Sequence, residues 1–304
     1  MTRKDWTGDY DYERLIAEEN THYLGIEVTE DLKEGGVHAS GCWQHYWQRV
    51  ADVLHRGPIG WIGDHLRDRF GFTEGPIEIL SLGSGSCVHE IALARSLKGY
   101  GRVVCTDINK ELFLQARDVA ATEGLDMEFR KADLNFITIE PGRYRMIFAH
   151  AVLHYVINLE RLCEEISAGL SPDAILHIVE VVGQNRRLIW DDSEAFANAL
   201  LRQVPKRITR SIRLAVKPED AGMEGIRQEK ILPELYRLFQ PEYELLHGAF
   251  MRFICAHPEL SRRFDPNDTE ARRYLDFLID CDTAAIRRRV LRPLEVWGVY
   301  LPLG

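Results

Sequence analysis

The spacing of apolar residues divides the chain into a helical beginning, a middle of short apolar runs and a second half that is again largely helical. Within residues 1–75, four apolar residues recur at the spacing of one helix face: Trp43, Trp47, Val50 and Leu54. Gly57-Pro58 predicts the break after this helix. From Ile77 the short apolar runs alternate with helical stretches, which is typical of a parallel sheet with crossover helices.

Five short β-rich runs predict the strands of this sheet: Ile77–Leu82, Arg102–Thr106, Met127–Lys131, Met146–Ala149 and Ala174–Val182. Two of the connecting helices have predictable boundaries. Asn109 caps a helix that ends at Gly124, and Asn158 caps a second helix, which Ser171-Pro172 stops. The middle of the chain is therefore predicted to be an α/β core.

The remainder of the chain is predicted to be a helical segment followed by two late strands, Tyr243–Ile254 and Val296–Leu303. Four segments follow from these patterns: a helical N-terminal cap (1–75), the α/β core (76–183), a second helical cap (184–240) and C-terminal strands and helices that complete the core (241–304). We expect the two caps to cover the functional site, because the core by itself supplies no roof.

The first predicted strand ends in a glycine turn. Gly83-Ser84-Gly85 follows the strand, and a helix begins near Cys87, so strand, turn and helix come in the order of a nucleotide site. Glycine lets the backbone approach a ligand closely. Val88 stands where a dinucleotide site has its third glycine, which favours a ligand without phosphates.

Carboxylates and polar rings follow the next three strands. Asp107 ends the second strand, 24 positions after Gly83, where a carboxylate can accept both hydroxyls of a ribose. Asp133-Leu134 follows the third strand and is suited to hold an adenine amino group and cover its ring. Three rings follow the fourth strand: His150, His154 and Tyr155. Because parallel strands end at one edge of a sheet, these side chains are expected to share one site.

In this order the motifs resemble those of the class I S-adenosylmethionine-dependent methyltransferases, over about residues 76–182. The similar motifs are Gly83-Ser84-Gly85 (glycine-rich turn), Asp107 (ribose acid), Asp133-Leu134 (adenine pair) and Leu153-His154-Tyr155 (after the fourth strand). Ser81 departs from the family pattern, because many members have an acidic residue there.

The resemblance implies an α/β, Rossmann-like fold with a mostly parallel sheet flanked by helices. It also implies an enzyme that uses S-adenosylmethionine as its cofactor. The implied cofactor-binding residues are Gly83, Ser84, Gly85, Asp107, Ile108, Asp133, Leu134 and His150. A weaker similarity of residues 180–186 and 228–233 to a bacterial subgroup favours a small acceptor, a secondary metabolite or a saccharide.

Methylation of a hydroxyl needs a general base, and histidine is suited to that role near neutral pH. Either His150 or His154 can be this base, and the sequence leaves the choice open. Five further residues are expected to bind the acceptor through flat rings or positive charge: Trp43, Tyr46, Tyr155, Arg186 and Arg227.

Composition narrows the partners to small molecules. The 38 basic and 47 acidic residues give a net charge of −9, which disfavours a nucleic-acid partner. No run of about 20 apolar residues predicts a membrane span, so we expect a cytoplasmic protein. The six cysteines form no C-x-x-C pair, which predicts no metal site. A homodimer is left open.

Two alternatives remain beside the methyltransferase. A nicotinamide-dependent oxidoreductase or epimerase also needs the glycine turn and Asp107, although Val88 and the lack of a Tyr-x-x-x-Lys pair after the fourth strand disfavour it. A catalytically silent scaffold that binds S-adenosylmethionine has the same motifs. The sequence does not name the acceptor or the atom that is methylated.

Overall fold

The computed structural model describes residues 11–25, 40–54, 58–70, 77–217 and 222–303. Within them a seven-stranded sheet has the order β3-β2-β1-β4-β5-β7-β6. Its strands are β1 Ile77–Leu82, β2 Gly101–Asp107, β3 Met127–Lys131, β4 Tyr144–His150, β5 Leu170–Val181, β6 Phe239–His247 and β7 Glu295–Pro302. Strands β1 to β5 pair in parallel, and β7 runs antiparallel to both of its neighbours. The mostly parallel, Rossmann-like sheet is therefore confirmed.

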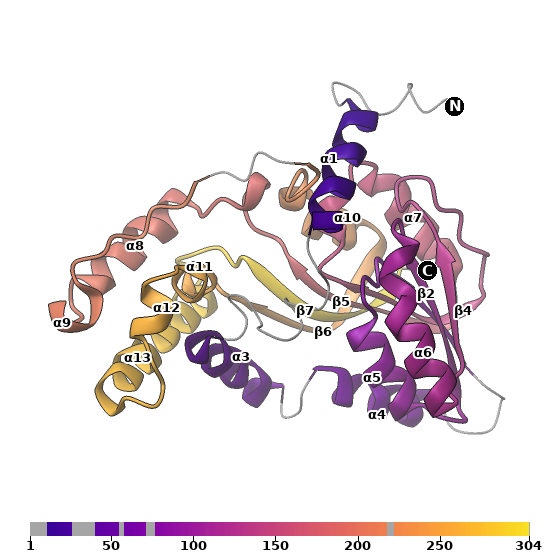
Figure 1. Ribbon diagram of the computed structural model, residues 1–304, viewed down its shortest axis with the longest axis horizontal. Helices are drawn as coiled ribbons and strands as arrows, with labels where there is room; N and C mark the ends of the chain where they lie inside the picture. Colours follow the sequence, from indigo (N-terminus) through magenta and orange to yellow (C-terminus); the bar gives the residue numbers. More distant parts are fainter. Residues whose placement is uncertain (1–10, 26–39, 55–57, 71–76, 218–221, 304) are drawn as a thin grey trace.

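Helices cover both faces of the sheet (Figure 1). The α-helices are α1 Tyr12–Gly25, α3 Gly41–Val53, α4 Pro58–Phe70, α5 Val88–Ser96, α6 Leu114–Glu123, α7 Leu159–Gly169, α8 Asp191–Leu201, α9 Lys206–Thr209, α10 Ile231–Leu238, α11 Met251–Ala256, α12 Leu260–Arg263 and α13 Thr269–Arg287. Short 3₁₀ helices are η2 Lys110–Phe113, η3 Leu153–Tyr155, η4 Asn185–Arg187 and η5 Gln228–Lys230. In Figure 1, α8, α9 and α11 to α13 gather at one end of the molecule, away from α5, α6 and α7.

Alternation along the strands separates two apolar layers. On β4, Met146 and Phe148 belong to the layer beneath α3 to α6, whereas Ile147 and Ala149 belong to the layer beneath α7 and α10. All four side chains are fully buried, as expected for a strand covered on both faces. None of the helices in the described parts of the chain has both the length and the apolar character that crossing a bilayer requires.

Of the two predicted N-terminal caps, Asn109 makes the capping hydrogen bond and Asn158 does not. The Asn109 side chain accepts a hydrogen bond from the Glu111 N–H (3.1 Å), and Gly124 ends α6 at a φ of 62°. Asn158 precedes α7 without capping it, because its amide donates to the Asn135 carbonyl instead (3.4 Å).

The prediction of a strand over Tyr243–Ile254 was wrong in its second half. Strand β6 ends at His247, and α11 begins four residues later. Gly248 turns the chain at a φ of +71°, and the carboxylate of Asp282 accepts the N–H groups of Ala249, Phe250 and Met251 (2.7–3.2 Å). Asp282 thus caps the start of a helix, and an apolar run by itself does not reveal such a distant cap.

The order of the strands creates a switch point beside β1. After β1 the chain adds β2 and β3 on one side, and it returns with β4 to the other side of β1. In open α/β sheets, ligands bind in the crevice at the carboxyl ends of strands where the direction of winding reverses. The fold therefore directs attention to the ends of β1 and β4.

Candidate functional site

A cavity of about 480 Å³ lies at this carboxyl edge. Its size is within the range of small-ligand sites, roughly 300–1,000 Å³. All the residues that the sequence predicted for the cofactor line it: Gly83, Ser84, Gly85, Asp107, Ile108, Asp133, Leu134 and His150. They come from the turn after β1 and from the ends of β2, β3 and β4. The structure thus brings four separate motifs to one place.

The turn after β1 requires glycine. Gly83 has a φ of +60°, and a Cβ atom there would lie 2.0 Å from Cγ2 of Val152. The N–H of Ser84 donates to the carbonyl of Thr106 (2.8 Å), which ties the turn to β2. The result is a bare backbone surface over which a ligand can lie closely.

Asp107 faces the cavity beside this turn. One of its carboxylate oxygens accepts the Gly85 N–H (2.9 Å) and the other accepts the Asn109 N–H (2.8 Å). Burial raises the pKa of Asp107, and the backbone hydrogen bonds oppose that rise. Each oxygen can accept a further hydrogen bond, so the carboxylate is oriented and able to receive hydroxyl groups from a ligand.

Asp133 contacts the first helix as well as the cavity. The Tyr12 hydroxyl donates to Oδ2 of Asp133 (2.5 Å), and the Asn135 N–H donates to Oδ1 (3.0 Å). The Tyr12 ring packs edge-on against Phe136, with 5.5 Å between centroids. Helix α1 therefore begins above the carboxylate that was predicted to hold adenine.

Ser81, the departure from the family pattern, lies under the glycine turn. Its hydroxyl donates to Oε1 of Glu90 (2.6 Å), and both side chains are buried. Burial raises the pKa of Glu90 to about 7. A carboxyl group is thus present beneath the turn, although it comes from α5 and not from β1.

His150 lies on the cavity wall as a neutral imidazole. Burial, followed by the proximity of His89 and His177, lowers the pKa of His150 well below its usual value. Its Nδ1 is buried and makes no hydrogen bond within the described residues. The ring lies tilted against that of His89, with 3.9 Å between centroids and 32° between planes. At neutral pH the imidazole therefore keeps a lone pair that can accept a proton.

His154 has the opposite electrostatic environment. Its Nδ1 lies 2.5 Å from Oε1 of Glu180 and its Nε2 lies 3.3 Å from Oε1 of Glu224. Burial by itself lowers the pKa of His154, but the two carboxylates outweigh it and raise the pKa to about 9. The second oxygen of Glu180 accepts the N–H groups of Val152 and Leu153 (2.9 and 2.6 Å). His154 is therefore a buried cation without a free lone pair, and it does not line the cavity.

The prediction that aromatic rings of α3 bind the acceptor is not supported by their position. Trp43 and Tyr46 are buried in the core and do not line the cavity. Tyr46 interacts with Nδ1 of His247 (2.8 Å), and the guanidinium of Arg252 lies 5.5 Å from the centre of the Trp43 ring. Helix α3 uses these rings to pack against the end of the sheet that carries β6 and β7.

The arginines predicted to bind the acceptor also lie outside the cavity. Arg227 donates to both oxygens of Glu160 (2.5 and 2.6 Å), and Arg186 donates to the carbonyl of Gly222 (3.0 Å). Their guanidinium groups hold loops in place. Tyr155 is the one predicted acceptor-binding residue that lines the cavity.

The residues of the cavity wall that sequence reasoning did not assign to the site include Glu19, His89 and Met223. His89 lies in the first turn of α5, six positions after Gly83, so its place beside the glycine turn was a usable signal. Glu19 and Met223 are 204 positions apart and meet where the Met223 N–H donates to the Glu19 carboxylate (3.0 Å). A contact between residues so far apart in the sequence cannot be predicted from a local sequence pattern.

The residues of the cavity fit a nucleoside without phosphates. Among the described residues, no lysine or arginine lines the cavity, so no fixed cation is available for a pyrophosphate. The glycine turn, the oriented Asp107 and the apolar Ile108 and Leu134 would hold a ribose and an adenine. This donor set favours S-adenosylmethionine over a nicotinamide dinucleotide.

Comparisons with known proteins agree with this assignment. Residues 79–173 match the family model described as a methyltransferase domain. A hybrid PKS-NRPS synthetase of Aspergillus flavus, lepA, is 28% identical over 119 residues, which are 38% of this chain and 3% of that protein. The region in common is thus a small part of a much larger relative.

Two solved structures also resemble the chain. An S-adenosylmethionine-dependent methyltransferase from Mesorhizobium loti has 17% identity, covers 80% of this chain and 98% of its own, and gives a TM-score of 0.45. A geranyl diphosphate methyltransferase in complex with S-adenosylmethionine has 12% identity over 93% and 95% of the two chains, with a TM-score of 0.47.

Residues 79–173 are therefore similar to a methyltransferase domain, and they form the centre of the mostly parallel sheet. The family match and the residues of the cavity together indicate S-adenosylmethionine as the cofactor.

Proposed function

We propose that the protein transfers a methyl group to a hydroxyl of a small molecule, with His150 as the general base. The observation that carries the proposal is the neutral imidazole of His150 on the wall of the cavity, at the end of β4. S-adenosylmethionine supplies a methyl group on a sulfonium sulfur when it is bound. The protein must then hold the acceptor in line with that methyl group and exclude water.

The choice between the two candidate histidines rests on their charge. His150 is available to accept a proton from a hydroxyl, because its lowered pKa keeps the ring neutral and it faces the cavity. His154 is already protonated between Glu180 and Glu224 and lies behind the cavity wall. We assign His154 a structural role, in which it orients η3 and thereby Tyr155, its neighbour in the chain and its partner in a ring contact (4.3 Å).

The acceptor class follows from weaker observations. The named relative is by its description a PKS-NRPS synthetase, which favours a small biosynthetic molecule over a macromolecule. Secondary-metabolite and saccharide acceptors are both consistent with the cavity volume. All six cysteines are free thiols, which suits the reducing cytoplasm. We keep the small-molecule acceptor and the cytoplasmic location as proposals.

Replacing His150 with alanine tests the base. We expect His150→Ala to lower turnover by about 100-fold or more, as loss of a general base does. Its affinity for S-adenosylhomocysteine, measured by calorimetry, is expected to change by no more than about threefold, because the imidazole does not anchor the nucleoside. Radiolabelled methyl transfer into fractionated small molecules supplies the activity assay.

His45→Ala is the matched control, since His45 belongs to α3, does not line the cavity and pairs with Asp276 (2.7 Å). It should retain wild-type turnover. Full activity of His150→Ala with the true acceptor would refute the base, and a nucleophilic nitrogen or carbon acceptor would replace the hydroxyl. Tight binding of S-adenosylhomocysteine by the wild-type protein without transfer to any fraction would indicate a silent scaffold.

A further inference from the structure

A second histidine lies beside His150 in the wall of the cavity. His89 also lines the cavity, and it belongs to the first turn of α5, which begins shortly after the glycine turn. The motifs that indicate the cofactor do not include it. The imidazole rings of His89 and His150 lie 3.9 Å apart between centroids. The structure thus places two titratable rings in contact at the position of the proposed base.

Two imidazole rings at this distance do not readily carry a positive charge at the same time. Like charges about 4 Å apart repel strongly enough to separate the two protonation steps by roughly one to three pH units. The two rings therefore titrate as a pair, which takes up its first proton well before its second. The position of the first proton depends on how well each ring is hydrated.

The surroundings of the two rings favour a proton on His89. The side chain of His89 is exposed although it lines the cavity, so water can hydrate its cation. Nδ1 of His150 is buried and makes no hydrogen bond within the described part of the chain. Desolvation lowers the pKa of both rings, and it does so further for His150, where repulsion from His89 is the second cause. The first proton is therefore expected on His89.

Six further titratable side chains lie in the cavity wall or beside the pair on α5 and β5. They are Glu19, Glu90, Asp107, Asp133, His177 and Glu180. Of these six, His177 is the one that contributes to the lowered pKa of His150, and its contribution comes after that of His89. His177 has a pKa of about 3 and is therefore neutral in mildly acidic solution. Among the described residues, His89 is thus the neighbour whose charge governs the protonation of His150.

We propose that His89 is a positioning residue for the base: the pair takes up its first proton at His89, and His150 keeps its lone pair for the proton of the acceptor in mildly acidic solution. This inference rests on the proposed methyl transfer and adds a residue that maintains its base. His89 acts through His150 and does not need to touch the acceptor. Without the charge of His89, His150 would be protonated at a higher pH, and the base would be lost there.

NMR of protein labelled with ¹³C at the histidine Cε1 positions tests the order of protonation. The sequence has 11 histidines, and the signals of His89 and His150 are identified by their loss in His89→Phe and His150→Ala. We expect the His89 signal to shift first as the pH is lowered from 7.5, while the His150 signal stays at its neutral position. A joint shift of the two signals, an earlier shift of His150, or no shift of either before the protein unfolds would each overturn the proposal.

Three replacements of His89 separate its charge from its shape. His89→Phe keeps a ring without the charge, His89→Lys keeps the charge without the ring, and His89→Glu reverses the charge. We expect His150 to be protonated at a higher pH in His89→Phe than in the wild type, and about one pH unit or more above the wild type in His89→Glu. His89→Lys should keep His150 neutral. A role in packing alone predicts the opposite, because phenylalanine preserves the ring contact and lysine does not. An unchanged titration of His150 in folded His89→Glu would contradict the proposal.

Arg95→Gln is the matched control for these changes of charge. Arg95 lies on the same helix, is exposed and does not line the cavity, and its replacement lowers the net charge by one unit. The His150 signal of this variant should titrate as in the wild type. A shift as large as that in His89→Glu would show that the overall charge of the protein, and not the ring pair, sets the order of protonation.

The pH dependence of turnover distinguishes this inference from the proposed function. Radiolabelled methyl transfer into the active fraction of small molecules is followed against pH. In His89→Phe the acid limb should lie at a higher pH than in the wild type, by the shift that NMR gives for His150. If His150→Ala loses turnover while the acid limb of His89→Phe coincides with that of the wild type, the base is supported and the role of His89 is refuted. Full activity of His150→Ala would refute the proposed function instead, whatever order of protonation NMR shows.

Discussion

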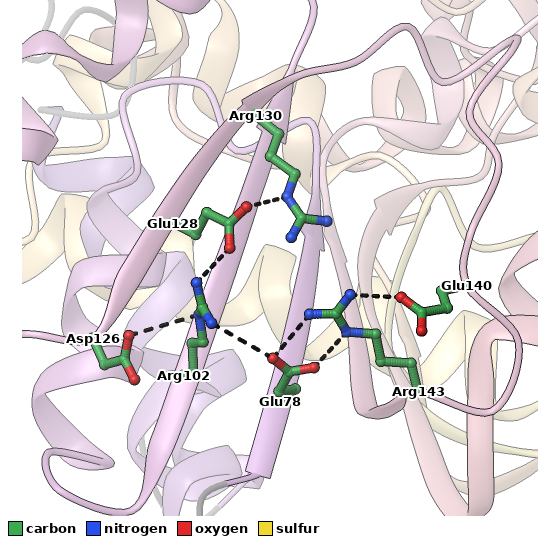
Figure 2. A network of polar contacts seen from close by, with 7 residues as sticks. All are labelled: Glu78, Arg102, Asp126, Glu128, Arg130, Glu140 and Arg143. Atoms are coloured by element: carbon green, nitrogen blue, oxygen red, sulfur yellow. Dashed lines mark hydrogen bonds and ion pairs between the residues drawn. The ribbon is translucent and has the colours of Figure 1, made fainter.

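At the amino edge of the parallel strands, charged side chains neutralise one another, whereas at the carboxyl edge carboxylates line a cavity that no lysine or arginine enters within the described residues. Figure 2 shows the amino edge, a network of seven residues: Glu78, Arg102, Asp126, Glu128, Arg130, Glu140 and Arg143. The same sheet thus carries acidic groups at both edges, but among the described residues only the amino edge pairs them with arginines.

The pairs of the amino edge are close and partly exposed. Arg143 donates to both oxygens of Glu78 (2.5 and 3.0 Å), and Arg102 lies 2.5 Å from Glu128. The hydrogen bond from Arg143 is the main cause of the lowered pKa of Glu78. Because water reaches these side chains, each pair contributes little to stability, typically below about 1 kcal/mol.

At the carboxyl edge the carboxylates are held by backbone N–H groups, or by a histidine. Asp107 accepts two N–H groups beside the cavity, and burial raises its pKa. Glu180 accepts two N–H groups and contacts His154. Similar acidic residues thus form exposed ion pairs with arginines at the amino edge. At the carboxyl edge they face a cavity or pair with a buried histidine cation.

The largest effect is expected from breaking the buried pair at the carboxyl edge. Glu180→Leu leaves the His154 imidazolium and the N–H groups of Val152 and Leu153 without their acceptor. Removal of one partner from a buried ion pair costs about 3–5 kcal/mol. Urea denaturation should show a loss of this size in the free energy of unfolding. A loss below about 1 kcal/mol would mean that the two edges do not differ as described.

Removal of the Asp107 carboxylate should weaken the cofactor without unfolding the protein. We expect Asp107→Ala to bind S-adenosylhomocysteine about 10- to 100-fold more weakly, because charge-assisted hydrogen bonds contribute about 1.5–3 kcal/mol each. Calorimetric titration gives the affinity. Asp126→Ala removes the same charge from the amino edge and should bind normally. Equal affinity of the two variants would contradict the assignment of Asp107.

His177 provides a third case beside the two edges, because it is buried within the sheet and has no charged partner among the described residues. Both ring nitrogens are buried without a hydrogen bond among the described residues, and the ring stacks on Phe148 (5.1 Å). Burial, followed by the proximity of His65 and His89, lowers the pKa of His177 to about 3. The unfolded chain therefore takes up this proton first as the pH falls below about 6.5.

The lowered pKa of His177 predicts the direction in which stability changes with pH. Stability contributed by neutral His177 is present above about pH 6.5 and is lost as the pH falls toward the folded pKa of about 3. Between pH 7.5 and 5, wild-type protein should lose about 2 kcal/mol more than His177→Phe, from 1.36 kcal/mol per pH unit. Chemical denaturation at both pH values measures the difference. Parallel losses in the two proteins would show that His177 does not titrate as described.

The smallest effect is expected from the amino edge. Arg102→Gln removes the contacts with Glu128 (2.5 Å), Asp126 (3.7 Å) and Glu78 (3.9 Å), all of them partly exposed. We expect a loss below about 1 kcal/mol, smaller still in high salt, and unchanged affinity for S-adenosylhomocysteine. A loss comparable to that of Glu180→Leu would show that this network stabilises the fold as strongly as the buried pair.

The amino-acid sequence by itself determined the order of strand, glycine turn and helix, and the acids that end β2 and β3. These features are local, because Gly83 follows β1 directly and Asp107 is the last residue of β2. Parallel strands bring their ends together in any such sheet, so the shared site could be predicted without coordinates. The end of a strand was harder to predict where an apolar run fits a helix as well as a strand, as at α11.

Only the tertiary structure decided the charge and position of the remaining groups. Whether His154 is a base or a cation depends on Glu180 and Glu224, which lie 26 and 70 positions away in the sequence. Trp43 and Tyr46 fit a ligand roof as well as a core by residue type, and packing against β6 and β7 assigned them to the core. The physical reason is that burial and Coulomb interactions act between groups that folding brings together, and sequence spacing does not record those distances.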